Sequence, residues 1–467
     1  MKKIEKKFGL AMAVCMVVGI VIGSGVFFKA QDVLSLTGGN VLLGVLAWLI
    51  GGAVMMIFSA TFAVMATRYE KTNGVMDYAE ATCGRVYTYF VGWFMTFIYY
   101  PAMTGVLAWL CARYTMVAVF GVSATSPDAL YGNQCIAIGA AYMILIYAIN
   151  VLSPKIAEKI QVSTTVIKLI PLAFIALVGT VVGLFSGTLS ENFAFLNGFS
   201  VGDGEDATFF GAICCTAFAY EGWIIATSIN AEIKNSKRNL PIALLIGSGI
   251  VVAAYVLYYL GILGLVEVEG VMAEGTNVAF KFFGSTVATV INFLIILSCL
   301  GTLNGLTVGC SRGLYSLAVR KEGPQPERFE SLDAHSNMPH NSAVIGLLLT
   351  AAWYVYFLGS QFFGWFGDFA FDSSELPIIT IYAIYVPMLI SFMVKSRDLG
   401  VVSRFLLPSL SVAGAGVMIA ASIFRHEYDN LYYLIVFAVI MLLGAIPLLM
   451  AKYGKGQKMA ENEQDAQ

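Results

Sequence analysis

The chain has 467 residues, of which 58% are hydrophobic and 12% charged, and its formal net charge is −2. Ordinary soluble domains are about 25% charged, so this composition excludes a water-soluble fold of the same length. The three histidines, and eight cysteines without a Cys-x-x-Cys pair, form no familiar metal-binding pattern, and we expect neither a metal nor a cofactor.

Apolar segments long enough to cross a bilayer follow one another along the chain. A span needs about 20 mostly apolar residues, and the first such segment is too long for the core of a signal peptide. We therefore predict an all-α polytopic membrane protein with about twelve spans. The spans are expected near residues 9–36, 40–67, 86–120, 133–152, 160–187, 208–230, 240–265, 285–312, 342–358, 376–394, 404–424 and 430–451.

Lysine and arginine gather in the connections on one side of these spans. The opposite connections hold only Lys281 and Arg425 among basic residues and are otherwise acidic. Because cytoplasmic loops carry an excess of Lys and Arg, the pattern predicts a multi-pass protein of the cell membrane. An even number of spans then places both termini in the cytoplasm.

The first expected span is interrupted by Gly23, Ser24 and Gly25. Irregular backbone at membrane depth is tolerated only where it is buried in protein or lines a cavity. If the helix unwinds here, the free N–H groups and dipole of the following half-helix form a site for a carboxylate. Alternatively, Gly19 and Gly23 form a GxxxG packing face.

The sixth expected span carries Glu221 beside Gly222. An acidic side chain at the centre of a span costs about 2.5–3.5 kcal/mol, so Glu221 should face a cavity, a cation or water. A structural pairing with another buried polar group is the alternative. Breaks in spans one and six, five spans apart, are what an inverted five-helix repeat with a midplane site produces.

Lys168 lies among apolar residues of the fifth expected span. A lysine removed from water there suits proton binding or the role of a fixed cation. Alternatively, its long side chain reaches back to the cytoplasmic interface.

Six short motifs follow one another in order along the chain. They are GSGVF at 23–27, NGVMDYA at 73–79, FAYEGW at 218–223, EIKN at 232–235, RNLP at 238–241 and GTLNG at 301–305. Their order and spacing resemble the amino acid–polyamine–organocation superfamily, and within it the bacterial relatives of the L-type amino acid transporters. Beyond residue 345 the likeness is one of hydropathy only.

The resemblance implies a leucine-transporter-like fold of five plus five helices in inverted repeat, with helices one and six broken. The first repeat would occupy residues 1–198 and the second residues 199–396. Two further helices and a cytoplasmic tail would occupy residues 397–467.

The resemblance also implies how an amino acid is held. N–H groups at the first break would take its α-carboxylate, carbonyl groups at both breaks would take its α-amine, and Phe218 would be the gating aromatic residue. Lys168 falls where many members carry a lysine in span five, near the region that sodium occupies in sodium-coupled relatives, which implies a coupling role and sodium-independent exchange or proton-coupled uptake. The expected substrate site consists of Ile22, Gly23, Ser24, Gly25, Phe218, Ala219, Tyr220, Glu221 and Gly222.

Two positions bear on the comparison with the animal relatives. Glu221 stands where many of them have a small residue, so it is expected to favour a cationic substrate, to titrate, or to pair with Lys168. Animal relatives join a heavy chain through a cysteine of the outer loop between spans three and four. Cys135 lies at the edge of an apolar run near that loop, and we expect no heavy-chain partner.

We therefore predict a sodium-independent amino acid transporter, an exchanger or proton-coupled, that works by alternating access and prefers small neutral substrates. A polyamine or cationic amino acid permease and a non-transporting sensor are the alternatives. The chain lacks HExxH, GxSxG and GxxxxGK, so no enzyme is predicted. The expected partners are the amino acid and the lipid bilayer, without nucleic acid.

Overall fold

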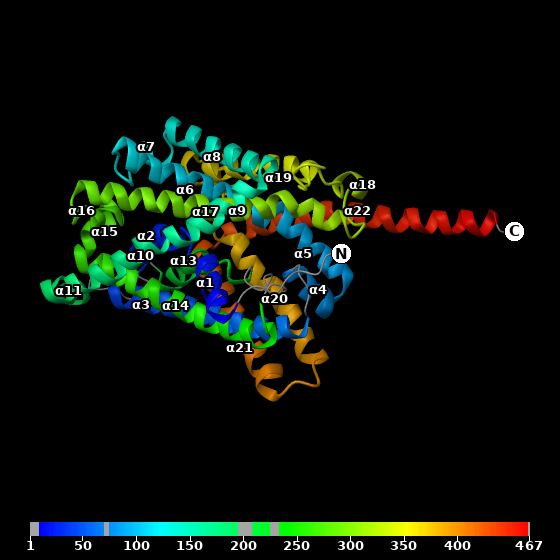
Figure 1. Ribbon diagram of the computed structural model, residues 1–467, viewed down its shortest axis with the longest axis horizontal. Helices are drawn as coiled ribbons and strands as arrows, with labels where there is room; N and C mark the ends of the chain where they lie inside the picture. Colours follow the sequence, from blue (N-terminus) through cyan, green and yellow to red (C-terminus); the bar gives the residue numbers. More distant parts are fainter. Residues whose placement is uncertain (1–8, 70–73, 195–207, 225–232, 466–467) are drawn as a thin grey trace.

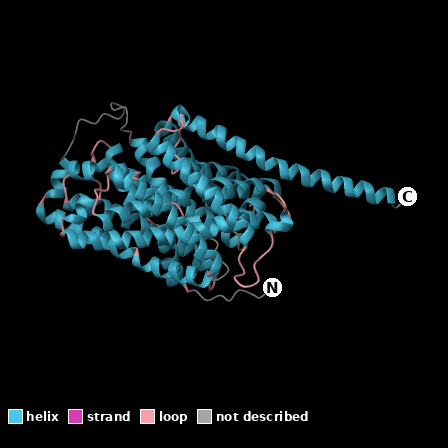
Figure 2. Cartoon of the chain, turned by 90° about the horizontal axis from the view of Figure 1, so that it is seen from above, coloured by secondary structure: helices cyan, strands magenta, loops and turns pink. Residues whose placement is uncertain are grey.

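The computed structural model describes residues 9–69, 74–194, 208–224 and 233–465. The motif residues Asn73 and Glu232, the N-terminal lysines and the expected repeat boundary at 198–199 lie outside these ranges. Helices run side by side in one bundle, and α22 extends past it at the end where α4, α5 and α18 lie (Figure 1, Figure 2).

The helices fall into two successive groups along the chain. The first group is α1 (Leu10–Val21), α2 (Gly25–Leu36), α3 (Val41–Arg68), α4 (Val75–Cys83), α5 (Arg85–Phe94), α6 (Tyr100–Phe120), α7 (Pro127–Leu130), α8 (Asn133–Leu152), α9 (Pro154–Ile167), α10 (Leu169–Phe174), α11 (Thr180–Ser186) and α12 (Thr188–Ala194). The second group is α13 (Phe209–Tyr220), α14 (Ser236–Leu265), α15 (Val268–Glu274), α16 (Asn277–Lys281), α17 (Ser285–Ala318), α18 (Pro326–Phe329), α19 (His340–Leu358), α20 (Leu376–Lys395), α21 (Leu407–His426) and α22 (Asp429–Asp465). Single π-helical turns, η1 (Met95–Tyr99), η2 (Ile175–Gly179), η4 (Gly359–Phe363) and η6 (Val402–Leu406), and the 3₁₀ turn η5 (Gly367–Phe369) occur between them.

Ten helices in the described part of the chain are long and apolar enough to cross a membrane. Each coincides with a span expected from hydropathy, which confirms the polytopic all-helical class. The first and sixth expected spans are instead built from shorter apolar helices, α1 with α2 and α13. The total of twelve spans and the inverted repeat stay predictions, since residues 225–232 are not described.

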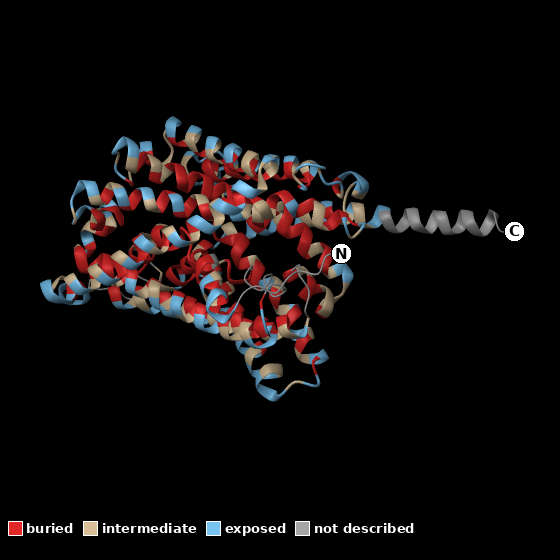
Figure 3. Cartoon of the chain, viewed as in Figure 1, coloured by how far each residue is buried: buried red, intermediate tan, exposed pale blue. Residues whose placement is uncertain are grey.

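Buried residues fill the middle of the bundle, whereas exposed residues cover its outside (Figure 3). In the interior α6 packs against α17, and α3 and α1 pack against α14. Many exposed side chains on the flanks are large and apolar, such as Phe185 at 90% and Leu184 at 67% exposure. Apolar exteriors of this kind suit contact with lipid and not with water.

Span five and span seven approach each other most closely at four glycines. A Cβ atom added to Gly179 or Gly183 would meet the backbone of α14, and one added to Gly261 or Gly264 would meet the backbone of η2 or α11. Small residues let membrane helices approach this closely, so the two spans pack backbone against backbone.

Candidate functional site

The helix of the first span stops at Val21 and restarts at Gly25, at the glycine-rich motif. Ile22, between the two halves, has extended backbone angles (φ −66°, ψ 102°). In the sixth span α13 stops at Tyr220, and Gly222 has a φ of 105°, a conformation that favours glycine. Glycine therefore stands where each helix departs from regular geometry.

The two irregular segments lie against each other. A Cβ atom on Gly25 would lie 2.5 Å from the Cα atom of Ala219, so only glycine permits this approach of α2 to α13. The hydroxyl group of Tyr255, from α14, lies 3.1 Å from the carbonyl oxygen of Val21 and 3.0 Å from that of Ala219. One tyrosine proton is thus shared between the ends of both interrupted helices. Sequence reasoning did not single out Tyr255.

A cavity of about 150 Å³ lies beside this junction. Most of the residues expected to form the site line it, and two do not. Tyr220 turns away from the cavity, because its hydroxyl donates to the carbonyl oxygen of Trp48 at 2.9 Å. Ile22 is also buried, at 1% exposure, but is not among the residues that line the cavity. The expected residues that line the cavity are Gly23, Ser24, Gly25, Lys168, Phe218, Ala219, Glu221 and Gly222.

One wall of the cavity is the start of α2. The first N–H groups of a helix have no intrahelical acceptor, and they point along the positive end of its dipole. Ser24, directly before α2, is 1% exposed, and its hydroxyl has no hydrogen-bond partner among the described residues. This wall therefore suits a bound anion. Gly19, in contrast, packs against the side chain of Thr165, and Gly23 lies outside α1, so the two glycines do not share a helical packing face.

Glu221 also lines the cavity. Its Oε1 atom accepts a hydrogen bond from the hydroxyl of Tyr99 at 2.6 Å, whereas its buried Oε2 atom has no partner within the described residues. Glu221 and Lys168 line the same cavity, but no ion pair joins them in the described part of the chain. The carboxylate keeps one oxygen atom available for a hydrogen-bond donor in the cavity.

Lys168 occupies the junction between α9 and α10 and is 2% exposed. This burial excludes, in the conformation described here, a side chain that reaches the aqueous interface. Gln161 lines the cavity beside it and accepts from the side-chain amide of Asn304 at 3.0 Å. Asn304 in turn accepts from Asn150 at 2.8 Å, so a short amide network joins α8, α9 and α17 next to the lysine.

A second, larger cavity of about 660 Å³ shares Tyr99, Gly305 and Leu306 with the first. It continues to Arg312 and Arg320 near the end of α17. The two cavities are therefore adjacent, and the larger one extends toward the end of the bundle where basic residues gather.

Aromatic rings close the other side of the small cavity. The ring of Phe218 packs edge-on against Phe28 at a centroid distance of 5.8 Å, and Phe28 packs against Trp109 at 5.6 Å. The Phe218 ring belongs to both the cavity wall and this aromatic cluster. The gating role that the sequence resemblance implies for Phe218 stays a prediction.

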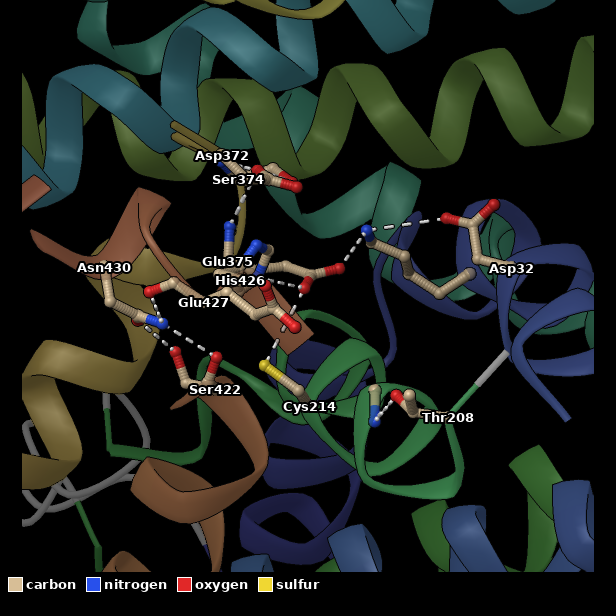
Figure 4. A network of polar contacts seen from close by, with 12 residues as sticks. Asp32, Thr208, Cys214, Asp372, Ser374, Glu375, Ser422, His426, Glu427 and Asn430 are labelled. Atoms are coloured by element: carbon tan, nitrogen blue, oxygen red, sulfur yellow. Dashed lines mark hydrogen bonds and ion pairs between the residues drawn. The ribbon is translucent and has the colours of Figure 1, made fainter. Parts of the chain in front are cut away.

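A buried ion pair lies beyond these rings. Lys29 of α2 donates to Oε1 of Glu375, the residue before α20, at 2.7 Å, and the two residues are 3% and 1% exposed. The other carboxylate oxygen lies 3.0 Å from Nε2 of His426 and accepts from the thiol of Cys214 at 3.7 Å (Figure 4). Asp32 lies 3.5 Å from Lys29. The cluster joins α2, α13, α20 and α21, and sequence reasoning missed it, although a lysine in a predicted span was a visible signal.

Comparison with known proteins gives a consistent result. The model of a family described as "Amino acid permease" matches residues 8–446. The chain is 28% identical over 432 residues to the serine/threonine exchanger SteT of Bacillus subtilis, covering 90% of this chain and 92% of that protein. It is 23% identical to the human b(0,+)-type amino acid transporter 1, covering 98% and 91% of the two chains. The human cystine/glutamate transporter is 24% identical over 73% of this chain and 66% of its own length.

Proposed function

The chain belongs to the amino acid permease family, and on that premise we propose that it exchanges small neutral amino acids across the cell membrane without sodium, by alternating access. The observation that carries the proposal is the cavity of about 150 Å³, which combines the start of α2, the end of α13, Lys168 and Glu221. The serine/threonine specificity of one relative supports a small polar substrate.

In this proposal the substrate lies between the two helix interruptions. Its α-carboxylate accepts hydrogen bonds from the N–H groups at the start of α2 and from the hydroxyl of Ser24. Its α-ammonium group donates to carbonyl oxygens at the end of α13 and near Ile22, since the last carbonyls of a helix lack intrahelical donors. The hydroxyl of Tyr255 holds the ends of α1 and α13 together, because it donates to the carbonyl oxygens of Val21 and Ala219.

Lys168 acts as the coupling residue. Its side chain is 2% exposed and lines the substrate cavity. A fixed cation in this place supplies the positive charge that a bound sodium ion otherwise provides. The role accounts for transport that needs no sodium.

Alternating access requires that one side of the cavity be closed while the other is open. The proposal is supported by the larger cavity, which adjoins the small one and extends toward the basic end, and by the aromatic contact of Phe218 and the buried Lys29–Glu375 pair. We assign the basic end to the cytoplasm, in accord with the distribution of Lys and Arg, so this conformation faces inward.

The proposed transporter works without a heavy chain. Cys135, the cysteine nearest the relevant outer loop, is fully buried, and its thiol donates to the carbonyl oxygen of Ala129 at 3.1 Å. A buried, hydrogen-bonded thiol is a poor site for an intermolecular disulfide.

The test is uptake of labelled serine, threonine or alanine into proteoliposomes, with and without unlabelled amino acid inside. The proposal expects uptake that requires internal amino acid and is unaffected when choline replaces sodium. Phe218→Ala should raise the apparent KM severalfold, because it removes aromatic contacts worth about 0.5–1.5 kcal/mol. Phe174→Ala, a change in an aromatic pair with Phe283, is the matched control and should leave KM unchanged. If a proton gradient drives uptake in the absence of internal amino acid, the protein is a proton symporter and not an exchanger.

A second candidate is a carrier of cationic amino acids or polyamines. The unpartnered Oε2 atom of Glu221 favours it, because a carboxylate in a cavity attracts a positively charged side chain. Competition by lysine, arginine and putrescine against labelled serine distinguishes the two. If these compounds compete and Glu221→Gln abolishes only their effect, the second candidate is correct.

A further inference from the structure

The side chains of Cys214, Glu375 and His426 converge in the interior of the bundle. They lie toward its acidic side, by which we mean the end opposite to the one where basic residues gather. The thiol sulfur, a carboxylate oxygen and an imidazole nitrogen all lie within 4.8 Å of one another, and all three residues are buried. They come from α13, from the segment before α20 and from the last turn of α21. Figure 4 shows Glu375 between the other two side chains.

We propose that these three residues form a site for one zinc-like divalent transition-metal ion. Thiolate, imidazole and carboxylate are the protein ligands of zinc, and three of them with a water molecule complete its tetrahedral shell. Ligand atoms in such a shell are roughly 3.3–3.8 Å apart, given metal–ligand bonds of about 2.0–2.3 Å. Here sulfur and Oε2 are 3.7 Å apart, within this range, whereas Nε2 and Oε2 are at a hydrogen-bond distance of 3.0 Å and would move slightly apart when both bind a metal. On binding, the thiol of Cys214 releases its proton to water, and His426 ligates through Nε2 in the tautomer that carries its ring proton on Nδ1.

The surroundings of the cluster support a bound cation. Lys29 binds the Oε1 atom of Glu375 and leaves Oε2 for the metal, in the way that outer hydrogen bonds commonly orient ligating carboxylates. The Oδ1 atom of Asp372 accepts hydrogen bonds from the backbone N–H groups of Ser374 at 2.6 Å and Glu375 at 3.2 Å. These bonds hold the main chain of Glu375, and thereby its side chain, in place.

The cluster also carries more negative than positive groups. The carboxylates of Asp32, Asp372 and Glu375 outnumber the cations Lys29 and Arg425, which interact with them. The site therefore accepts further positive charge, and a divalent ion supplies it even after one thiol has been deprotonated.

Metal binding would hold the acidic side of the transporter closed. The ligands belong to α13 and to the elements at either end of the α20–α21 pair, and they cluster beside the Lys29–Glu375 contact. An ion that binds only when these elements are together shifts the population toward the closed arrangement. At 100 times its dissociation constant, the shift is about 100-fold. This coupling, unlike the site itself, rests on the proposed function, and it makes zinc an inhibitor of exchange.

The binding test uses purified full-length protein and does not depend on transport. Co²⁺ is added as a spectroscopic probe, and a near-ultraviolet band from a thiolate ligand together with visible bands of tetrahedral Co²⁺ is expected. Cys214→Ser should remove the thiolate band and His426→Asn should weaken binding about tenfold or more. Cys15→Ser and His340→Asn change a cysteine and a histidine outside the cluster and should leave both signals unchanged. An absent thiolate band in the wild type, or an equal band in Cys214→Ser, overturns the site.

The transport test adds Zn²⁺ to the exchange assay. Inhibition of the wild type that is at least tenfold weaker in Cys214→Ser supports the coupling to closure. Metal binding without inhibition overturns the coupling and keeps the site. If the wild type exchanges no amino acid at all, the proposed function fails, while the Co²⁺ spectra still decide whether the metal site exists.

Discussion

Replacing Lys29 by methionine should open the acidic side of the transporter. The substitution keeps an apolar stem of similar length but removes the ammonium group 2.7 Å from Glu375. Leaving one partner of a buried ion pair unpaired costs about 3–5 kcal/mol. Since Glu375 retains His426 at 3.0 Å, we take the lower end of this range. At about 1.4 kcal/mol for each factor of ten, the population of the open arrangement rises about 100-fold.

The assay is the rate at which an impermeant thiol reagent, added outside intact cells, labels Cys214. This thiol is fully buried behind the ion pair in the structure, so its labelling rate reports the open population. We expect Lys29→Met to accelerate labelling by up to about 100-fold, and Cys214→Ser in the same background to abolish the increase. Lys281→Met is the matched control, because Lys281 is 53% exposed and its pair with Glu274 is worth under about 1 kcal/mol.

A double variant distinguishes the effect of losing the ion pair from the effect of a general loss of packing. Replacing Lys29 and Glu375 together by methionine removes both charges, and a buried pair replaced by apolar residues is often neutral or stabilising. Labelling should then return toward the wild-type rate. The reasoning is wrong if Lys29→Met labels at the wild-type rate, or if the double variant labels as fast as the single one.

Three further changes test the substrate cavity. Gly25→Ala should abolish exchange, because the added Cβ atom meets backbone 2.5 Å away, whereas Gly249→Ala, with its nearest atom at 3.9 Å, should leave exchange and thermal stability intact; equal losses would contradict the argument. Tyr99→Phe removes a hydrogen bond of 2.6 Å to a carboxylate and should weaken apparent affinity about tenfold, since such bonds are worth about 1.5–3 kcal/mol. Tyr142→Phe, which removes a hydroxyl contact with Thr115, is its control and should keep the wild-type KM. Lys168→Met should lower the turnover rate more than the apparent affinity, and a wild-type turnover rate would refute its coupling role.

Much of the architecture could be predicted because a lipid environment imposes a simple rule on sequence. Ten expected spans coincide with long apolar helices, since each is a run of apolar residues that must satisfy its own backbone. The two interruptions were also visible, because Gly25 and Glu221 are residues that a regular span does not favour. Whether the described helices form an inverted repeat stays a prediction.

The contacts around the cavity were less accessible to sequence reasoning. Tyr255 and Tyr99 were read as part of apolar spans, because hydropathy does not say which face of a helix meets which neighbour. The pair of Lys29 with Glu375 joins residues 346 positions apart, and they meet because α2 and α20 both pack against α13. Lys29 was overlooked because the surrounding segment remains apolar on average, although a lone lysine at membrane depth is itself a signal.

The crossing of span five and span seven has a consequence for how the sequence can change. At Gly179, Gly183, Gly261 and Gly264 the atoms nearest to an added Cβ are main-chain atoms, which no neighbouring substitution can make smaller. A larger residue there cannot be accommodated by repacking a side chain and requires the helices themselves to separate. The crossing therefore leaves no room for larger residues, whereas Phe185, a short distance along the same span, is 90% exposed and meets no such steric limit. Evolution of this part of the protein is confined to its outer surface.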